Sequence, residues 1–270
     1  MSMTTSAKRL VRKTARSTSS IWDPVYVAVG KRRNDWSGPV PPLENRLRVS
    51  GPGVGHFIKV GRALRDLVLG AIDDYGQRRP GLKVLDFGAG VGRTLFHLDD
   101  QGFELHATDV DPTAMAYLRK HCPGIDVRVN DYGPPLTYQA ETFDVVYSIS
   151  IWTHLPVDAQ MPWLVEMRRV LKPGGLALLT VAGFRGLAVL RDRDPVWADV
   201  TDEDLRAAGT LYKEYPAEER TAKRMPGVTG SYGLTAHSPD YIREHWPAAG
   251  FDVLEVRGTS NQDLVILRAV

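Results

Sequence analysis

The chain has 270 residues, of which 43% are hydrophobic and 24% are charged, and this composition is typical of a globular protein rather than a fibrous or disordered one. The formal net charge is +2, and no apolar run approaches the roughly 20 residues that a membrane-spanning helix needs. A single cysteine, Cys122, excludes a disulfide within the chain and favours a reducing compartment, so we expect a cytoplasmic protein without stable membrane insertion.

The first 55 residues are predicted to lie outside the main domain. Residues 1–20 contain five basic residues and no acid, with many Ser and Thr, which indicates a disordered tail or, as the alternative, a transit peptide. Five charges without interleaved aromatic residues predict only weak contact with nucleic acid or anionic lipid, so no nucleic-acid partner is expected. Residues 21–55 are rich in Gly and Pro and predict an extended, irregular arm that packs over the domain.

A domain of alternating strands and helices is predicted from residue 56 onward. Apolar residues at helical spacing predict a first helix over about 56–76. Strands that alternate with helices imply a parallel sheet that is buried on both faces. The predicted strands are 83–87, 104–109, 126–130, 143–148 and 176–181, and the predicted helices between them are 92–100, 112–121 and 158–171.

This alternation breaks after residue 183. Residues 184–236 are mostly polar, with one predicted helix at 202–208 and no clear strand, and we interpret them as a lid or substrate-binding insertion because they are too long for a plain connector. A helix at 239–248 precedes two strands, 251–257 and 263–269, which must pair antiparallel because only a short turn joins them. The predicted fold is therefore α/β: a Rossmann-like, seven-stranded, mostly parallel sheet with an antiparallel terminal strand pair and helices on both faces.

A glycine-rich turn follows the first predicted strand. There an apolar strand runs into Gly88-Ala89-Gly90-Val91-Gly92, where glycines allow a ligand to approach the backbone closely and a following helix offers free N–H groups to an anion. Arg93 occupies the sixth position, where dinucleotide-binding sequences need Gly or Ala. Asp86 suits a ligand with an ammonium group, and Asp109 ends the next strand 23 residues later, close to the spacing of the acid that binds ribose hydroxyls.

These motifs, taken in order, resemble those of class I S-adenosylmethionine-dependent methyltransferases. The matching segments are Val84–Gly92, Asp109, Asn130-Asp131, Phe143–Ser148 and Arg169–Gly175. The resemblance implies S-adenosylmethionine as cofactor, with Asp86 and the glycine backbone at its methionine part, Asp109 at the ribose and Asp131 at the adenine amino group. The cofactor-binding residues implied in this way are Asp86, Gly88, Ala89, Gly90, Gly92, Asp109, Val110, Asp131, Tyr132, Ser148 and Ile149.

Two histidines are candidates for a catalytic base. Methyl transfer is an in-line displacement, so the protein must align the acceptor and, for an aliphatic hydroxyl, remove its proton. His154 follows the fourth predicted strand, where ligands of doubly wound sheets bind, and His237 closes the insertion. Each histidine has an alternative: His154 could position a ligand or anchor its loop, and His237 could merely begin the helix that follows.

The acceptor pocket is predicted to include aromatic walls and no metal. Trp152 and Tyr232 are the predicted substrate-binding residues, with Trp197 as a further candidate, although tryptophans are more often part of the core. No acid follows the fifth strand, where metal-dependent relatives in this family carry one, so a required divalent ion is not expected.

The acceptor class is predicted from a second, softer resemblance. The segments around His154, Gly174 and Tyr232 together resemble those of bacterial methyltransferases of saccharide and glycolipid assembly, which implies O-methylation of a sugar hydroxyl. Methylation of another small molecule, such as a polyketide-type hydroxyl or an amine, and a catalytically inactive cofactor-binding partner subunit are the alternatives. The expected partner is a small-molecule or saccharide acceptor, and a homodimer is left open.

Overall fold

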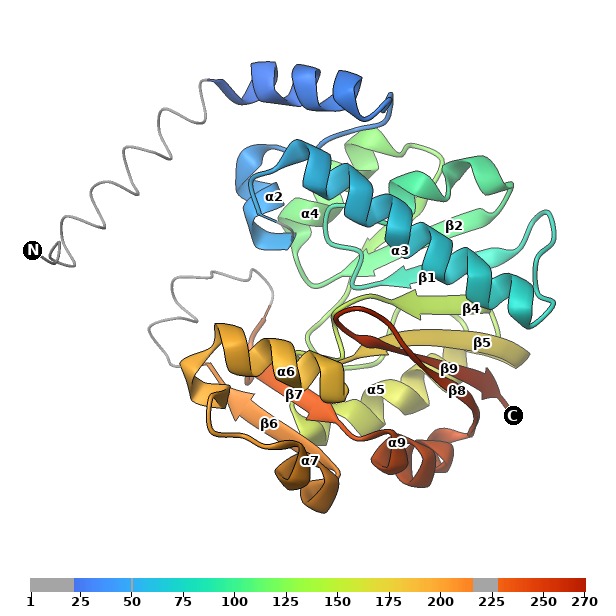
Figure 1. The fold of residues 1–270 in the computed structure, drawn as a ribbon. Helices are drawn as coiled ribbons and strands as arrows, with labels where there is room; N and C mark the ends of the chain where they lie inside the picture. Colours follow the sequence, from blue (N-terminus) through green and yellow to red (C-terminus); the bar gives the residue numbers. More distant parts are fainter. Residues whose placement is uncertain (1–21, 50, 216–227) are drawn as a thin grey trace, which may run out of the picture.

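The computed structural model describes residues 22–49, 51–215 and 228–270 (Figure 1). The predicted tail, residues 1–20, lies outside the described residues. So does the segment 216–227, which belongs to the predicted insertion.

A seven-stranded sheet forms the centre of the molecule, with the order β3-β2-β1-β4-β5-β9-β8 (Figure 1). The first five strands in this order run parallel, and β9 runs antiparallel to both β5 and β8. The predicted Rossmann-like fold with an antiparallel terminal pair is therefore confirmed. The strands are β1 (Lys83–Phe87), β2 (Glu104–Asp109), β3 (Asp126–Val129), β4 (Phe143–Ser148), β5 (Leu171–Val181), β8 (Phe251–Gly258) and β9 (Asp263–Ala269).

Helices cover both faces of this sheet because its strands are apolar on both sides. In β4, Val145 and Tyr147 pack with α3 (Val54–Asp74) and α4 (Pro112–His121), whereas Val146 points to the opposite face. That opposite face is covered by α5 (Val157–Val170) and α9 (Pro239–His245), which ends in the 3₁₀ turn η4 (Trp246–Ala249). Successive strand residues point to opposite faces, so two cores require the continuous apolar runs seen in the sequence.

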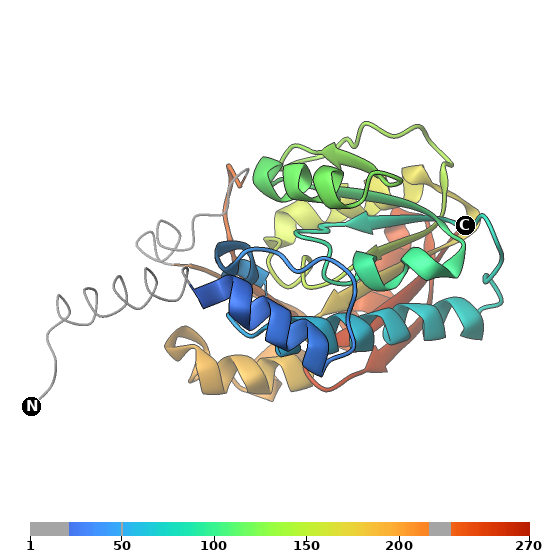
Figure 2. The same cartoon turned by 90° about the horizontal axis from the view of Figure 1, so that it is seen from above.

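The N-terminal arm is helical, not extended as predicted. Residues 22–33 form a helix, here called helix 22–33, and α2 (Leu43–Val49) follows it. Pro41 and Pro42 stand just before α2, where proline is tolerated. These two prolines thus mark the connection between the two helices. Figure 2 shows helix 22–33 beside α3.

The helix predicted at 92–100 is replaced by two short 3₁₀ turns, η1 (Leu95–His97) and η2 (Asp99–Gln101). Gly92 has φ of +78°, so the glycine turn extends to this residue and delays any helix. Only the Phe96 N–H reaches a carbonyl four residues back, whereas the amides of His97 and Leu98 donate three residues back. The segment is therefore too short to develop a regular α-helix.

The insertion contains more regular structure than predicted. The predicted helix at 202–208 is present as α7 (Asp202–Ala208), and α6 (Phe184–Arg193) and η3 (Pro195–Trp197) precede it. Two strands that were not predicted, β6 (Thr210–Glu214) and β7 (Gly233–His237), pair antiparallel as a separate two-stranded sheet. The insertion has its own small core, which includes Leu187, Trp197, Leu205 and Ala236.

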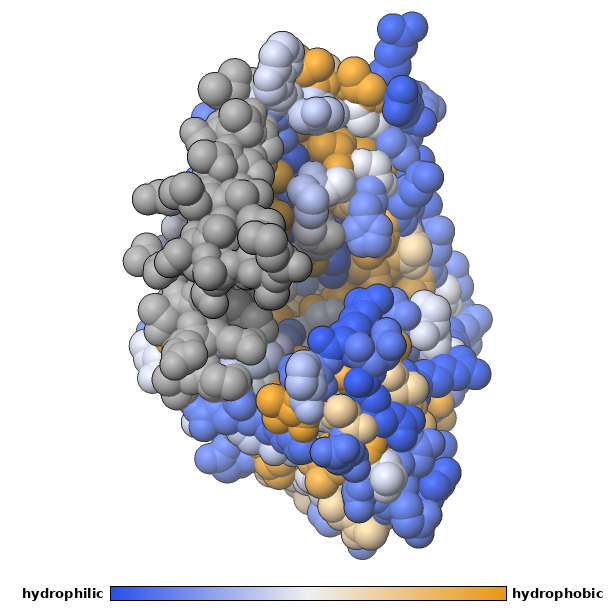
Figure 3. Space-filling model, turned by 60° about the vertical axis from the view of Figure 1, so that its left-hand side comes forward, coloured by the Kyte–Doolittle hydropathy of each residue, from blue (hydrophilic) through white to orange (hydrophobic). Residues whose placement is uncertain are grey.

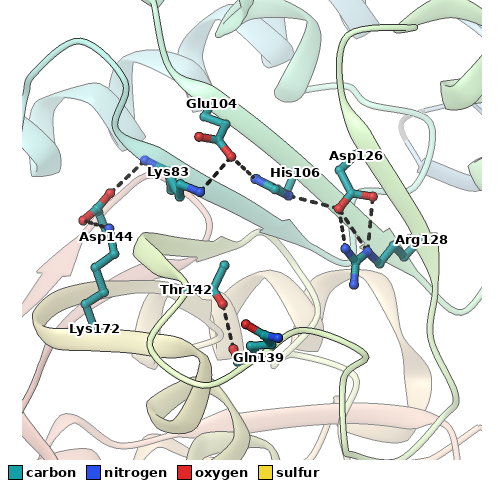
Figure 4. Close-up of polar contacts among 9 residues, drawn as sticks. All are labelled: Lys83, Glu104, His106, Asp126, Arg128, Gln139, Thr142, Asp144 and Lys172. Atoms are coloured by element: carbon teal, nitrogen blue, oxygen red, sulfur yellow. Dashed lines mark hydrogen bonds and ion pairs between the residues drawn. The ribbon is translucent and has the colours of Figure 1, made fainter.

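Charged side chains connect the amino ends of the central strands (Figure 4). Lys83 of β1 pairs with Glu104 of β2 at 3.0 Å, and His106 lies between Glu104 and Asp126 of β3. Asp144 of β4 accepts hydrogen bonds from the Lys83 backbone N–H at 2.9 Å and from the Lys172 ammonium at 2.8 Å. These contacts join the amino ends of the central strands. The carboxyl ends lie at the opposite edge of the sheet, where ligands of such sheets bind.

Candidate cofactor and acceptor site

A cavity of about 230 Å³, here called the cofactor cavity, lies at the carboxyl ends of β1, β2 and β4. An adjoining pocket of about 90 Å³ shares five of its lining residues, Gly88, Asp109, Ile151, His154 and Tyr232. The molecular face drawn in Figure 3 is hollowed near its middle, beside the grey residues, on the side where these strand ends lie. The remaining residues of the cofactor cavity are Asn45, Arg48, Val49, Asp86, Ala89, Gly90, Val91, Arg93, Thr94, Asp111, Ala114, Ile149 and Ser150.

Glycine is required at Gly88 for two separate reasons. Gly88 has φ of +79°, in the left-handed region, and its N–H donates to the Thr108 carbonyl at 2.9 Å. A Cβ at this position would collide with the Ile151 side chain. The glycine therefore brings the floor of the cavity against the loop that follows β4.

We expect Gly88→Ala to destabilise the fold by about 1–3 kcal/mol more than Gly102→Ala, because only the first substitution overpacks its surroundings. Both glycines have positive φ, +79° and +68°, so both substitutions carry the left-handed penalty, but a Cβ at Gly102 meets nothing within 4 Å. Urea unfolding of the two variants measures the difference. Equal losses would show that the close approach to Ile151 costs nothing.

Asp86 carries a buried carboxyl group that faces the cofactor cavity. Its side chain is 3% exposed, and the Tyr147 hydroxyl donates to it at 2.7 Å. Burial raises the pKa of Asp86 to about 7, and the hydrogen bond from Tyr147 opposes this rise. A desolvated carboxylate with a neutral phenol as its donor fits the ammonium group of an amino-acid ligand, as predicted for Asp86.

Asp109 is held rigidly at the boundary of the cofactor cavity and the adjoining pocket. One of its oxygens accepts from the Gly90 N–H and the other from the Asp111 N–H, each at 2.8 Å. Each carboxylate oxygen keeps a further lone pair, so both can still accept from vicinal hydroxyls such as those of ribose. Burial is also the main cause that raises the pKa of Asp109, and the backbone hydrogen bonds oppose it.

At the end of the site expected to hold adenine, Asn130 lines the pocket instead of the predicted Asp131. Asp131 is exposed and is not among the residues that line the two pockets, whereas Asn130 is buried and lines the adjoining pocket with Val110 and Tyr132. The Thr108 hydroxyl donates to the Asn130 side-chain oxygen at 2.8 Å, which fixes the amide. The sequence contains both residues, but their order along the chain does not reveal which one faces inward.

The segment after β4 forms one wall of the cofactor cavity. Ser148 was predicted to contact the cofactor, but its side chain is completely buried, and Ile149 lines the cavity instead. Ser150 has φ of +61°, a strained conformation for a residue with a side chain. The Thr180 hydroxyl accepts its N–H at 2.7 Å and Gln262 bonds its hydroxyl, so β5 and the turn before β9 hold this strained turn in place.

His154 and Tyr232 lie where the cofactor cavity meets the adjoining pocket, and both line both spaces. Their rings stack, with centroids 4.9 Å apart and an angle of 18° between planes. Nδ1 of His154 lies 2.9 Å from the Gly233 carbonyl oxygen. Because a carbonyl only accepts, Nδ1 carries a proton, and Nε2 is the basic atom of the neutral ring.

The insertion is fastened to the loop that carries His154. The Thr235 N–H of β7 donates to the Thr153 carbonyl at 2.8 Å, and its hydroxyl donates to the Leu155 carbonyl at 2.6 Å. The His237 N–H donates to the Ala182 carbonyl at the end of β5. Strand β7 therefore fixes the position of His154 from both sides.

The structure does not bring His237 or Trp152 into the cavity. His237 is completely buried, its Nε2 lies 2.8 Å from the Gln160 side-chain oxygen, and burial lowers its pKa to about 3. Trp152 is also completely buried and packs on Trp246, with ring centroids 5.4 Å apart. Trp197 belongs to the core of the insertion. These three side chains stabilise the fold and are removed from the set of candidate site residues.

Helix α2 supplies site residues that the sequence did not indicate. Asn45, Arg48 and Val49 line the cofactor cavity. Arg48 pairs with Asp111, and the Arg93 guanidinium donates to the Val49 carbonyl at 2.7 Å. The arm was predicted to pack over the domain, but a prediction of extended chain could not say which side chains point inward.

The described residues contain neither a candidate metal site nor a candidate membrane span. In residues 22–49, 51–215 and 228–270 no group of three or more His, Cys, Asp or Glu side chains could hold a metal ion. Over the same part of the chain, every helix is too short or too polar to cross a membrane.

Comparison with known proteins agrees with this geometry. Residues 84–175 match the family described as a methyltransferase domain. Phosphoethanolamine N-methyltransferase 2 of Caenorhabditis elegans is 31% identical over 117 residues, which cover 42% of this chain and 26% of that protein. The chain thus spans about a quarter of the length of this relative. It also matches an uncharacterised protein of Haemophilus influenzae, with 31% identity over 102 residues, and spans 41% of that protein's length.

Solved structures share the fold. The PH0226 protein of Pyrococcus horikoshii OT3 has 21% identity and a TM-score of 0.53, with 77% of this chain and 91% of that chain covered. A Burkholderia thailandensis 1,6-didemethyltoxoflavin-N1-methyltransferase with bound S-adenosylhomocysteine has 15% identity and a TM-score of 0.53, with 79% and 78% covered. The match of residues 84–175 supports the enzyme class and the cofactor predicted from the sequence. The solved structures show that the fold is one that S-adenosylmethionine-dependent methyltransferases share.

Proposed function

We propose that the protein transfers a methyl group from S-adenosylmethionine to a hydroxyl of a sugar or saccharide, with His154 as general base. The observation that carries this proposal is the position of His154 where the cofactor cavity meets the adjoining pocket, with Nδ1 fixed on the Gly233 carbonyl. An aliphatic hydroxyl is a poor nucleophile until a base removes its proton, whereas a phenolate or carboxylate needs little help.

The residues present fit the cofactor in three places. Asp86 offers a buried carboxyl group to an ammonium, Asp109 offers free lone pairs to ribose hydroxyls, and Asn130 and Tyr132 border a mostly apolar pocket that suits adenine. When bound, S-adenosylmethionine supplies an activated methyl group on a sulfonium. The chain itself orients the acceptor and excludes water, and Nε2 of His154 accepts the hydroxyl proton.

Aromatic side chains next to His154 support a saccharide acceptor. Tyr232 stacks on the imidazole, and Tyr215 lies 5.5 Å from Tyr232 between ring centroids. Burial raises the pKa of Tyr232 well above its usual value, so its hydroxyl stays protonated and can donate a hydrogen bond. Flat aromatic faces with polar tips are well suited to the mixed apolar and hydroxyl surface of a sugar ring.

An amine or another small-molecule hydroxyl is the second candidate acceptor. The C. elegans relative is named as a phosphoethanolamine N-methyltransferase, which supports an amine acceptor. A catalytically inactive cofactor-binding subunit is the third candidate, and the retained Asp86, Asp109 and His154 speak against it.

Release of S-adenosylhomocysteine across an acceptor panel tests the proposal. The panel holds mono- and oligosaccharides, phenols, amines and short-chain acids, each with and without chelator. We expect turnover with a saccharide, unaffected by chelator. Turnover only with amines or phenols would replace the acceptor class. Tight cofactor binding without turnover on any acceptor would support the binding subunit.

A further inference from the structure

Helix 22–33 presents an apolar stripe to solvent. Trp22, Val25, Tyr26 and Val29 are 60%, 51%, 63% and 44% exposed. Their spacing of three, four and seven residues places all four side chains on one face of the helix. Apolar side chains are visible at the top of the molecular face in Figure 3, next to the grey residues, which is where this helix lies.

The opposite face of the same helix packs against the domain, and this packing turns the stripe toward solvent. Asp23 pairs with Arg46, a guanidinium that is only 1% exposed. Val27 packs against the main core, and Gly30 lies so close to Val54 that a Cβ there would collide with it. These contacts fix the rotation of the helix and leave the stripe without a partner among the described residues.

Positive charge is concentrated in the N-terminal part of the chain, which includes helix 22–33. The first 33 residues contain eight Lys and Arg and a single acid, Asp23, which already pairs with Arg46, whereas the remaining residues contain 26 basic and 31 acidic residues. Three of the eight cations, Lys31, Arg32 and Arg33, end helix 22–33 itself. The stripe thus has positive charge at its carboxyl end and follows a basic stretch of sequence, on a protein that is otherwise acidic.

We propose that helix 22–33 docks on an anionic lipid surface. Trp and Tyr favour the boundary between headgroups and acyl chains, valines add apolar area, and Lys and Arg are attracted to anionic headgroups. Nucleic acid fits less well, because Val25 and Val29 offer it neither donors nor a stacking surface. A second copy fits less well too, because two strongly basic segments repel each other.

Sedimentation of the full chain with vesicles tests this docking and does not depend on the proposed acceptor. We expect binding to vesicles that contain phosphatidylglycerol, little binding to pure phosphatidylcholine, and loss of binding at high salt. Val25→Ser with Val29→Ser is expected to weaken binding about tenfold. Val165→Ser is the matched control, since Val165 is 52% exposed on α5, away from the stripe, and should bind normally.

Three results would overturn the proposal. They are equal binding to neutral and anionic vesicles, unchanged binding of the Val25/Val29 variant, and the absence of any vesicle binding. In the last case, retention on duplex DNA or RNA would assign the segment to nucleic acid, and a stripe-dependent dimer in analytical ultracentrifugation would assign it to a second copy. Circular dichroism of each variant checks that the chain remains folded.

Discussion

Replacing His154 by glutamine is expected to lower kcat for methyl transfer by about 10²–10⁴-fold, the range typical of a removed general base. Glutamine keeps an N–H that can bond the Gly233 carbonyl, but its amide cannot accept a proton near neutral pH. Affinity for S-adenosylmethionine should change by less than about tenfold, because the groups that fit the charged ends of the cofactor are untouched. Single-turnover rates and calorimetric titration of the cofactor separate the two quantities.

His245→Ala provides the matched control for His154. His245 is exposed on α9, stacks on Tyr241 and lines neither pocket. This variant should retain normal kcat. A His154→Gln enzyme with near-normal kcat would show that the histidine positions a ligand or anchors its loop. In that case the acceptor would be one that needs no base, such as a phenolate or an amine.

Asp86→Asn is expected to weaken cofactor binding by about 10- to 150-fold at pH 8, because a buried charged hydrogen bond contributes about 1.5–3 kcal/mol. The same substitution should remove most of the pH dependence of binding. In the wild-type protein the pKa of Asp86 is about 7, raised by burial. Below that value the carboxyl group is protonated and neutral, so affinity for an ammonium should fall with falling pH, by up to about tenfold per unit.

Tyr147→Phe tests the cause of this pH dependence. The Tyr147 hydroxyl stabilises the ionised form of Asp86, so its removal should raise the pKa of Asp86 further and move the binding midpoint to higher pH. Titration of S-adenosylhomocysteine between pH 6 and 9 by calorimetry measures the midpoint in all three proteins. A wild-type affinity that is flat over this range would mean that Asp86 does not meet the ammonium group.

The sheet could be predicted from the sequence because each central strand is a short apolar run between turn signals. The runs at 83–87 and 143–148 are apolar on both faces, which only a strand covered by helices requires. By contrast, β6 and β7 were missed because both segments mix polar with apolar residues and β6 is only partly buried, so neither is a continuous apolar run. Local patterns carry no signal for the pairing of these two strands.

The sequence does not show which way a side chain points, and this limited the prediction of the site. The cofactor motif placed Asp86, Gly88 and Asp109 correctly at the cavity, because the backbone of a strand-turn unit determines where they lie. His154 and His237 could not be ranked from sequence, since one follows a predicted strand and the other closes the insertion, and neither segment shows which way its side chain points. Packing distinguishes them: His237 is enclosed with Gln160, whereas His154 is turned to the cavity by Gly233.

The hydrogen bonds between β7 and the His154 loop affect how the acceptor site can change in evolution. The segments after β1, β2 and β4, together with α2, supply most of the lining of the cofactor cavity, whereas His154 is oriented by a strand of the insertion. Changes in the insertion outside β7 and Tyr232 can therefore alter the acceptor without disturbing most of the cofactor cavity. Changes in β7 are different, because they can also move His154, the proposed proton acceptor, so selection for a new acceptor and selection for rate act on the same short strand, Gly233–His237.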